Sequence, residues 1–171
     1  PKGKEIYAVF NLATTYGQNN ENEKEILNCN VTLPINLFKY ALKMGVKKII
    51  NTDTFFGKPE YDYQHLRTYI SSKNQLVEEA RKLTKHKKIS LINLRLEHVF
   101  GANDSENKFV TNLLKSFYQK KIIPLTDGMQ KRDFIYVDDV VQAFSTVISN
   151  HNLYGFTEYE VGSGKSIELK F

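Results

Sequence analysis

The sequence lacks the features that mark secreted, membrane-spanning and metal-thiolate proteins. Its one cysteine, Cys29, excludes an internal disulfide and leaves a metal site without the thiolates that such sites commonly use. No apolar run approaches the roughly 20 residues of a membrane-spanning helix, and the opening residues PKGKEIY do not resemble a signal peptide. We therefore expect a cytoplasmic protein with no metal ion and no membrane partner.

The sequence also lacks the strong excess of positive charge that is typical of nucleic-acid-binding domains. Lys and Arg number 24 against 19 Asp and Glu, a net charge of +5. The densest basic run, RKLTKHKK at 81–88, lies where a helix is expected to end, and cations there interact favourably with the helix dipole. Because no aromatic or glycine pattern accompanies this run, we expect no nucleic-acid partner, although the charges can help attract an anionic small molecule.

What the sequence contains is an alternation of two hydrophobic patterns over 171 residues, the length of one domain. Short β-branched runs predict strands at 6–12, 47–52, 88–96, 123–125, 134–137 and 157–161. Apolar residues at helical spacing predict helices at 22–44, 66–84, 107–119 and 138–149. Pro34 predicts a kink or a break in the first helix.

This alternation predicts an α/β fold, in which a parallel sheet is covered by helices on both faces. Ligands of such sheets bind beyond the carboxyl ends of the strands. The segments that follow the first three predicted strands are ATTYG, TDTFFG and EHVFGAND. They are polar and carry glycines, so we expect the functional site among them.

Tyr69 and Lys73 stand four residues apart at the start of the second helix, which places them on one helical face. Such a pair also arises by chance in a chain with ten tyrosines. The spacing alone therefore does not decide between a catalytic pair and two ordinary residues on a helix face. Thr52 ends the preceding strand. A hydroxyl and a phenol that converge on one carbonyl oxygen can polarise it and supply a proton. The phenol pKa of about 10 is high for this task, and a nearby ammonium together with an oxidised nicotinamide would lower it.

Five segments carry a resemblance to a known family. They are FNLATTYG (10–17), NVTLPINLFKYALKMGVKKIINTDTFFG (30–57), TYISSK (68–73), LRLEHVFGAND (94–104) and GMQKRDFIYVDDVVQAF (128–144). Their order resembles that of extended short-chain dehydrogenases/reductases, and within these the NAD-dependent epimerase/dehydratase family that acts on nucleotide-diphosphate sugars. The combination of NTDT, RLEHVFG and QKRDFIYVDD looks most like the CDP-abequose and CDP-paratose synthase-type reductases.

The resemblance implies a Rossmann-like fold, a cofactor that is NAD or NADP, and roles for individual residues. Thr52 matches the family's catalytic Ser/Thr, Tyr69 the acid/base, and Lys73 the residue that holds the nicotinamide ribose and lowers the tyrosine pKa. The residues implied to bind cofactor are Asn11, Leu12, Ala13, Tyr69, Lys73 and Val99. The residues implied to bind the nucleotide-diphosphate sugar are Thr52, Asp53, His98, Phe109 and Arg132, the last by gripping the diphosphate.

Without the resemblance, each residue has a structural alternative. Thr52 could simply end a strand and cap the next turn, and Arg132 beside Asp133 is typical of a surface ion pair. His98 is as compatible with a structural strand-end histidine as with a sugar contact. Glu97 could fix the His98 tautomer or face solvent.

The departures from the family pattern favour one reaction. The related 4,6-dehydratases carry acidic residues directly after the catalytic threonine, whereas this chain keeps Asp53 but has Thr54 in the second position. Reduction of a 4-keto-6-deoxy sugar needs only a hydride from the cofactor and a proton from Tyr69. Epimerisation at C4 uses the same groups and stays open.

The family's glycine-rich cofactor loop is absent, since none of the nine glycines forms a G-x-x-G-x-x-G or G-x-G-x-x-G pattern. The resemblance implies an incomplete fold, with residues 1–100 as the second half of the NAD(P)-binding domain and 101–171 as part of the sugar-binding lobe. We expect such a chain to bind NAD(P) poorly by itself. An inactive fragment or a non-catalytic relative of the fold is the alternative. Helices 22–44 and 66–84 are the expected surface of a homodimer.

Overall fold

The computed structural model describes residues 5–18, 20–58, 63–85, 89–123, 126–151 and 153–170. The chain divides into two compact units. The first comprises Pro1–Arg95 and Thr146–Glu160, and the second comprises Leu96–Ser145 and Val161–Phe171. This division falls close to residue 100, where the sequence analysis expects the boundary between the two parts. The first unit also includes Thr146–Glu160. The cofactor-binding and sugar-binding assignments of the two parts stay predictions.

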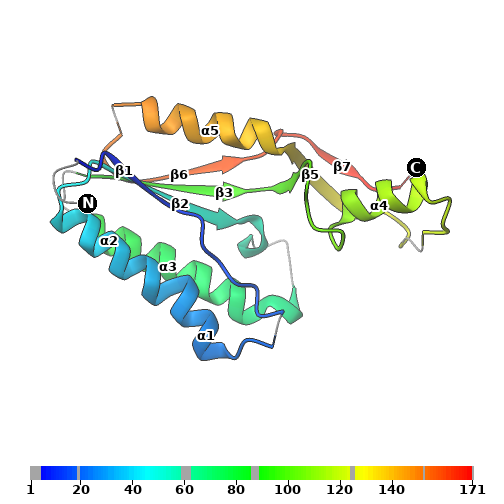
Figure 1. Cartoon of the computed structure of the whole chain (residues 1–171), viewed down its shortest axis with the longest axis horizontal. Coiled ribbons are helices and arrows are strands. Elements are labelled where there is room, and N and C mark those ends of the chain that lie inside the picture. The colour runs from blue at the N-terminus through cyan, green and yellow to red at the C-terminus, as the bar shows by residue number, and fades with distance from the viewer. Residues whose placement is uncertain are drawn as a thin grey trace. The chain divides into compact units, whose positions relative to one another are not determined.

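The first unit is built on a four-stranded sheet in the order β1-β2-β3-β6. Its strands are β1 (Ala8–Asn11), β2 (Lys48–Thr54), β3 (Ser90–Leu96) and β6 (Gly155–Val161). β1 and β2 pair in parallel, and the arrows of β2, β3 and β6 point the same way in Figure 1. The predicted α/β parallel sheet is therefore confirmed, and it brings the carboxyl ends of β1, β2 and β3 to one edge.

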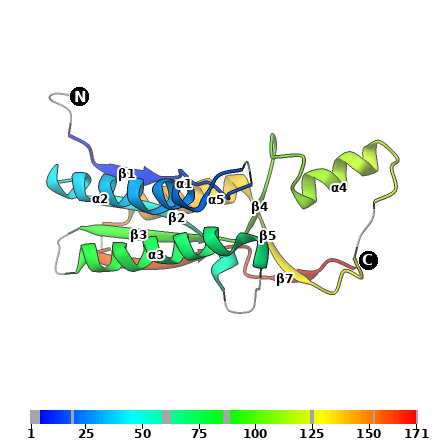
Figure 2. The same ribbon diagram turned by 90° about the horizontal axis from the view of Figure 1, so that it is seen from below.

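Three α-helices of the first unit lie together on one face of this sheet (Figures 1 and 2). They are α1 (Glu23–Leu27), α2 (Leu33–Lys43) and α3 (Arg67–Thr84). Two short 3-10 turns, Phe55–Gly57 and Gln64–Leu66, precede α3. Fully buried side chains join the two layers into one core, with Ile49 and Leu91 from the strands and Phe38 and Leu76 from the helices.

The predicted break near Pro34 takes the form of a π-helical segment, Asn28–Thr32, between α1 and α2. The N–H of Leu33 donates to the carbonyl of Asn28, five residues earlier, instead of four. Pro34 has no N–H to donate and is well accommodated in the first turn of a helix, so the chain restarts its helical hydrogen bonding at α2.

A buried lysine fixes the end of α5 (Val137–Ser149) to the sheet of the first unit. Lys48 Nζ donates to the carbonyl of Val147 at 3.1 Å and also to the carbonyls of Ile148 and Asn150. The last carbonyls of a helix generally lack donors within the helix, and they form the negative end of its dipole. Lys48 thus holds the last turn of α5 on the face opposite α1–α3 (Figure 1).

The second unit contains a three-stranded sheet, helix α4 and the larger part of α5 (Val137–Ser145). β5 (Lys131–Tyr136) pairs in parallel with β4 (His98–Phe100) and antiparallel with β7 (Ser166–Glu168), and α4 (Phe109–Tyr118) precedes β5. β4 and β7 were not predicted, because strands of three residues are too short for alternation to show. Of the strand predicted at 123–125, Ile123 lies in no strand and the other two residues are outside the described part of the chain.

In the part of the chain that the structure describes, no helix has the length and apolar character to cross a membrane.

Candidate functional site

Lys73, Thr52 and Asn11 are linked at the carboxyl ends of β1 and β2. Lys73 Nζ donates to the backbone carbonyl of Thr52 at 2.6 Å. The Thr52 hydroxyl donates to the backbone carbonyl of Asn11 at 3.1 Å. Helix α3 and two strand ends therefore meet at this point, where ligands of parallel sheets bind.

Burial lowers the pKa of Lys73, and the carboxylate of Asp53 opposes that effect. An ammonium has three N–H donors and one of them reaches Thr52, so Lys73 can also hold the hydroxyl groups of a bound ribose. This geometry suits the predicted role of Lys73 but leaves the role itself untested.

Tyr69 lies one turn before Lys73 on α3 and is only 3% exposed. Its ring stacks on that of Tyr16, with centroids 4.6 Å apart, and packs edge-on against Phe56. Burial raises the pKa of Tyr69. The sequence analysis expects a lowered pKa for Tyr69, from a nearby ammonium and an oxidised nicotinamide. In the chain without a cofactor, the largest influence on this pKa is instead the desolvation of the phenolate.

Two hydroxyl groups, those of Thr54 and Tyr16, influence the Tyr69 phenol. The interaction with the Thr54 hydroxyl lowers the pKa of Tyr69, and the interaction with the Tyr16 hydroxyl raises it. Thr54 and Tyr16 escaped prediction as site residues because neither belongs to a spacing motif with Tyr69.

Asp53, predicted to bind substrate, directs its carboxylate into the sheet. Its side chain is 3% exposed and lies 3.4 Å from Nε of Arg95. Asn93 Nδ2 also donates to it at 3.1 Å. The reason is strand alternation: Asp53 shares a face with the core residue Ile49, whereas Thr52 points to the other side.

A ladder of asparagine side chains crosses the same face of the sheet. Asn11 Nδ2 donates to Asn51 Oδ1 at 2.7 Å, and Asn51 Nδ2 donates to Asn93 Oδ1 at 2.7 Å. Asn93 in turn donates to the carboxylates of Asp53 and Glu158. Because ionised carboxylates only accept, they fix the orientation of Asn93 and hence of every amide before it.

Two more residues predicted to contact the cofactor, Leu12 and Ala13, follow Asn11 directly and are exposed. The side chain of Asn11 is buried in the ladder, so only its backbone is directed to Thr52.

The remaining predicted residues lie in the second unit. His98 and Val99 are in β4 opposite Phe134 and Ile135 of β5, and Arg132 is also in β5. Phe109 begins α4 and stacks on Phe134, with centroids 6.2 Å apart. The structure thus gathers His98 and Phe109 around one aromatic ring.

His98 is held in its neutral form. Burial, and then the positive charge of Arg132, lower its pKa to about 4. Its Nδ1 is 3.9 Å from the carboxylate of Glu97, which is too long for a hydrogen bond. A neutral imidazole can either donate or accept, which suits a hydroxyl-rich ligand.

Asp133, beside Arg132, secures the loop that follows β6. Its carboxylate accepts from the N–H and hydroxyl of Ser163, at 2.8 and 2.6 Å, and from the N–H of Gly164 at 2.9 Å. A Cβ at Gly162 would lie 2.6 Å from this carboxylate. Asp133 therefore stabilises the loop after β6 through these hydrogen bonds.

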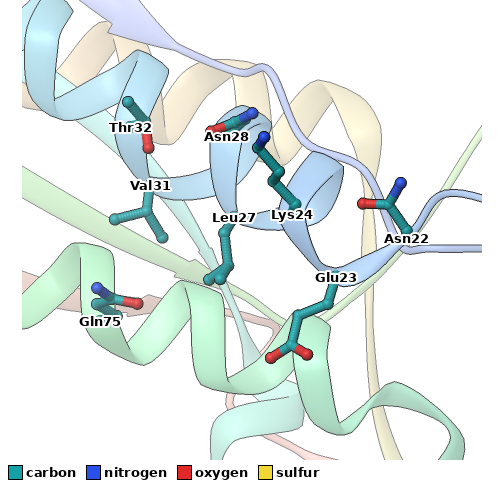
Figure 3. Close-up of a pocket in the computed structure, with 8 residues that line it drawn as sticks. All are labelled: Asn22, Glu23, Lys24, Leu27, Asn28, Val31, Thr32 and Gln75. Atoms are coloured by element: carbon teal, nitrogen blue, oxygen red, sulfur yellow. The ribbon is translucent and has the colours of Figure 1, made fainter.

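A pocket of about 630 Å³ lies against α1, the π-helical segment and α3 of the first unit (Figure 3). Leu27 and Val31 point towards Gln75 of α3 there, and Asn22 and Lys24 lie at its edge. It falls on the helices predicted to form a homodimer, and that prediction stays untested.

Residues 2–162 match the family model described as "NAD dependent epimerase/dehydratase family". The chain belongs to this family. It is 41% identical over 166 residues to the CDP-abequose synthase of Salmonella muenchen, and 38% identical over 167 residues to that of Salmonella typhimurium. These alignments cover 96% of the chain and 57% and 56% of the two enzymes, so the chain spans little more than half of each relative's length.

The same fold occurs in UDP-glucuronic acid 4-epimerase from Bacillus cereus in complex with NAD. The TM-score is 0.81 at 19% identity, over 96% of this chain and 56% of the epimerase. The predicted family and the predicted resemblance to CDP-abequose synthases are thereby confirmed, and the family is NAD dependent.

Proposed function

We propose that this chain carries the catalytic residues of an oxidoreductase that reduces the 4-keto group of a nucleotide-diphosphate 4-keto-6-deoxy sugar. The observation that carries the proposal is the bond from Lys73 to Thr52 at the strand ends, with Tyr69 one helical turn away. Membership of an NAD-dependent family and the similarity to CDP-abequose synthases support it. Because the chain spans 57% of the Salmonella muenchen enzyme, the activity belongs to a protein that includes a cofactor-binding half.

The residues present fit one end of NAD(P). Lys73 offers ammonium donors for the nicotinamide ribose, and the exposed Leu12 and Ala13 follow β1 at the same edge of the sheet. The sequence holds no glycine-rich loop for the pyrophosphate. When bound, the reduced nicotinamide supplies the hydride for the keto carbon.

The chain's own residues supply the proton and the orientation. Tyr69 gives its phenol proton to the sugar oxygen as that oxygen gains negative charge, and the buried site strengthens this interaction. The Thr52 hydroxyl can turn from the Asn11 carbonyl to the same sugar oxygen. Lys73 holds the Thr52 carbonyl and places positive charge near Tyr69 once the phenolate forms.

The second unit is proposed to bind the nucleotide sugar. The guanidinium of Arg132 suits a diphosphate, since it can form two parallel hydrogen bonds to phosphate oxygens. His98 and Phe109, which flank Phe134, offer a neutral imidazole and an aromatic face to the sugar. Asp53 is not included, because its carboxylate is occupied in the sheet.

The test uses two proteins, the 171-residue chain by itself and the same chain fused behind the N-terminal part of the Salmonella muenchen enzyme. Each is mixed with NADH or NADPH and a CDP- or dTDP-linked 4-keto-6-deoxy sugar, and NAD(P)H absorbance is followed. We expect turnover by the fusion and weak nicotinamide binding by the chain alone in calorimetry.

Tyr69→Phe in the fusion should remove turnover while nicotinamide binding is retained. A fusion that is folded by circular dichroism and binds NAD(P)H, yet does not consume it, would overturn the reductase proposal. Appearance of the C4 epimer of a non-keto nucleotide sugar, without net consumption of NAD(P)H, would instead establish the C4 epimerase.

A further inference from the structure

Tyr69, the residue proposed to give the proton, is almost completely covered by the chain. It is 3% exposed, although the reaction proposed above needs its hydroxyl group within hydrogen-bonding distance of a sugar oxygen, roughly 2.5–3.0 Å. A sugar cannot come that close while the cover is in place. Part of the cover must therefore move before the reaction.

Two aromatic side chains pack on the ring of Tyr69, and they differ in their freedom to move. Phe56 meets it edge-on, with centroids 6.3 Å apart, and is itself packed on Phe55 and Tyr63 at 4.2 and 4.7 Å. Tyr16, on the loop after β1, stacks on Tyr69 with centroids 4.6 Å apart and is 42% exposed. Phe56 is held in an aromatic cluster, whereas Tyr16 has solvent beside it. Tyr16 is therefore the side chain that can turn away.

The backbone on both sides of Tyr16 is fixed. Thr15 exchanges two hydrogen bonds of 2.9 Å with the buried side chain of Asn30, one through its N–H and one through its carbonyl. Gly17 adopts φ +76°, which glycine tolerates, and a Cβ there would lie 2.5 Å from Cδ1 of Ile26. Movement of Tyr16 is thus confined to rotation of its side chain, which is fast in exposed residues.

The same asparagine holds the loop in place against α3. Asn30 Nδ2 donates to the Ser72 hydroxyl at 3.0 Å, and that hydroxyl donates to the Tyr69 carbonyl at 2.6 Å. All three residues are buried. Loop and helix therefore keep their relative position when the ring of Tyr16 turns, and the ring can return to the same stack.

We propose that Tyr16 is a gate, whose ring closes over Tyr69 in the free protein and swings aside before the sugar reaches the phenol. The proposal rests on the function proposed above, because it concerns access to the same tyrosine. The closed state competes with the sugar, so sugar binding is weakened in proportion to the fraction of molecules that are open. Stacking of two aromatic rings is favourable enough to keep the gate mostly closed.

A gate differs from a binding residue in the sign of its effect. Loss of a side chain that contacts the sugar weakens sugar binding, and so does loss of a side chain that supports the fold. Loss of the gate strengthens sugar binding, because the stack no longer has to be broken. We expect Tyr16→Ala to bind the sugar about 3- to 10-fold more tightly than the wild type.

The first experiment tests the cover in the 171-residue chain by itself and needs no ligand. Photochemically induced nuclear polarisation with a flavin dye enhances the NMR signals of those tyrosine rings that the dye can reach. In the wild type we expect enhancement of Tyr40, which is 61% exposed, and little of Tyr69. Tyr16→Ala should enhance Tyr69 strongly, whereas Tyr16→Phe, which keeps the ring stack, should not. A Tyr69 signal that stays weak in Tyr16→Ala would overturn the proposal.

The second experiment measures sugar binding by the fusion protein with oxidised NAD(P) bound, which cannot reduce the sugar. Calorimetric titration with the CDP-linked 4-keto-6-deoxy sugar should give a Kd lower by about 3- to 10-fold in Tyr16→Ala and within about twofold of the wild type in Tyr16→Phe. CDP, which lacks the sugar, should bind equally to all variants. Tyr40→Ala on α2, which removes an exposed tyrosine ring elsewhere, is the matched control and should change neither value.

Sugar binding that is unchanged or weaker in Tyr16→Ala would overturn the gate. Tighter binding of NAD(P)H without a change for the sugar would also overturn it, since the nicotinamide would then be the group that displaces Tyr16.

The gate and the proposed reaction can fail separately. A fusion that reduces the sugar, without a gain in affinity in Tyr16→Ala, keeps the reaction and excludes the gate. A fusion that binds the sugar without reducing it, while Tyr16→Ala still gains affinity, keeps the gate and excludes the reduction. A folded wild-type fusion that binds no keto sugar excludes both.

Discussion

Lys73 donates from Nζ to the backbone carbonyl of Thr52 at 2.6 Å, which joins helix α3 to the end of strand β2. A side chain that bonds to a neighbouring backbone is fixed in direction before any ligand arrives. Preorganised donors of this kind cost no reorganisation during reaction. The bond also explains why burial of the Lys73 ammonium is tolerated, since one of its donors is satisfied within the fold.

Replacing Lys73 should separate stability from activity. Lys73→Met removes a buried ammonium and leaves a side chain of similar length, so we expect the free energy of unfolding to change by less than about 1 kcal/mol. Turnover of the fusion should fall by about 100-fold or more, because the charge beside Tyr69 is lost. Chemical denaturation and steady-state kinetics give the two values, and a parallel loss of both would assign Lys73 a structural role.

Lys48 should prove more important for stability than its sequence suggests. Lys48→Met removes the ammonium that donates to the carbonyls at the end of α5, and we expect a loss of about 2 kcal/mol in the free energy of unfolding. Lys47→Met, at the adjacent exposed lysine, is the control and should have little effect. Urea denaturation of the two variants and the wild type measures the effect. Equal denaturation midpoints for all three proteins would contradict the stabilising role of Lys48.

The asparagine ladder should behave as one unit. Asn51→Ala removes the oxygen that accepts from Asn11 and the amide that donates to Asn93. We expect the free energy of unfolding to fall by about 2–4 kcal/mol. In a double-mutant cycle with Asn93→Ala, the second substitution should cost less once the first is present. Additive effects would show that the three side chains stabilise the sheet independently.

His98 should make stability depend on pH. Its folded pKa of about 4 lies below the ordinary 6.5, so the unfolded chain binds more protons between these values. The stabilisation is therefore complete above pH 6.5 and is lost as the pH falls towards 4, by about 3 kcal/mol. His98→Gln should remove this part of the pH dependence, measured as the difference between the denaturation free energies of variant and wild type at pH 7 and 4.5.

Arg132→Ala should weaken binding of the nucleotide sugar. Loss of a bidentate charge-assisted contact corresponds to an affinity lower by about 10- to 100-fold. The measurement is calorimetric titration of the fusion with CDP, and Lys131→Ala, a neighbouring exposed cation, is the matched control. Equal losses in both variants would point to general charge attraction instead of a diphosphate contact.

The amino-acid sequence by itself determined the main elements of the first unit. The helix predicted over 66–84 is α3 (Arg67–Thr84), and the strands predicted over 47–52 and 88–96 are β2 and β3 with small changes at their ends. These elements could be predicted because hydrophobic periodicity and proline act through neighbours in the chain. The family too could be recognised, since its five segments are linear motifs.

Only the tertiary structure decided which polar groups face one another. Tyr16 and Tyr69 stack, Asp53 turns into the sheet towards Arg95, and Lys48 reaches the end of α5, although none of these partners is close in sequence. Such contacts depend on which face each strand presents and on how the loop after β1 is anchored. Local pattern placed Tyr69 and Lys73 on one helix; the packing of a loop, a helix and two strand ends determined what surrounds them.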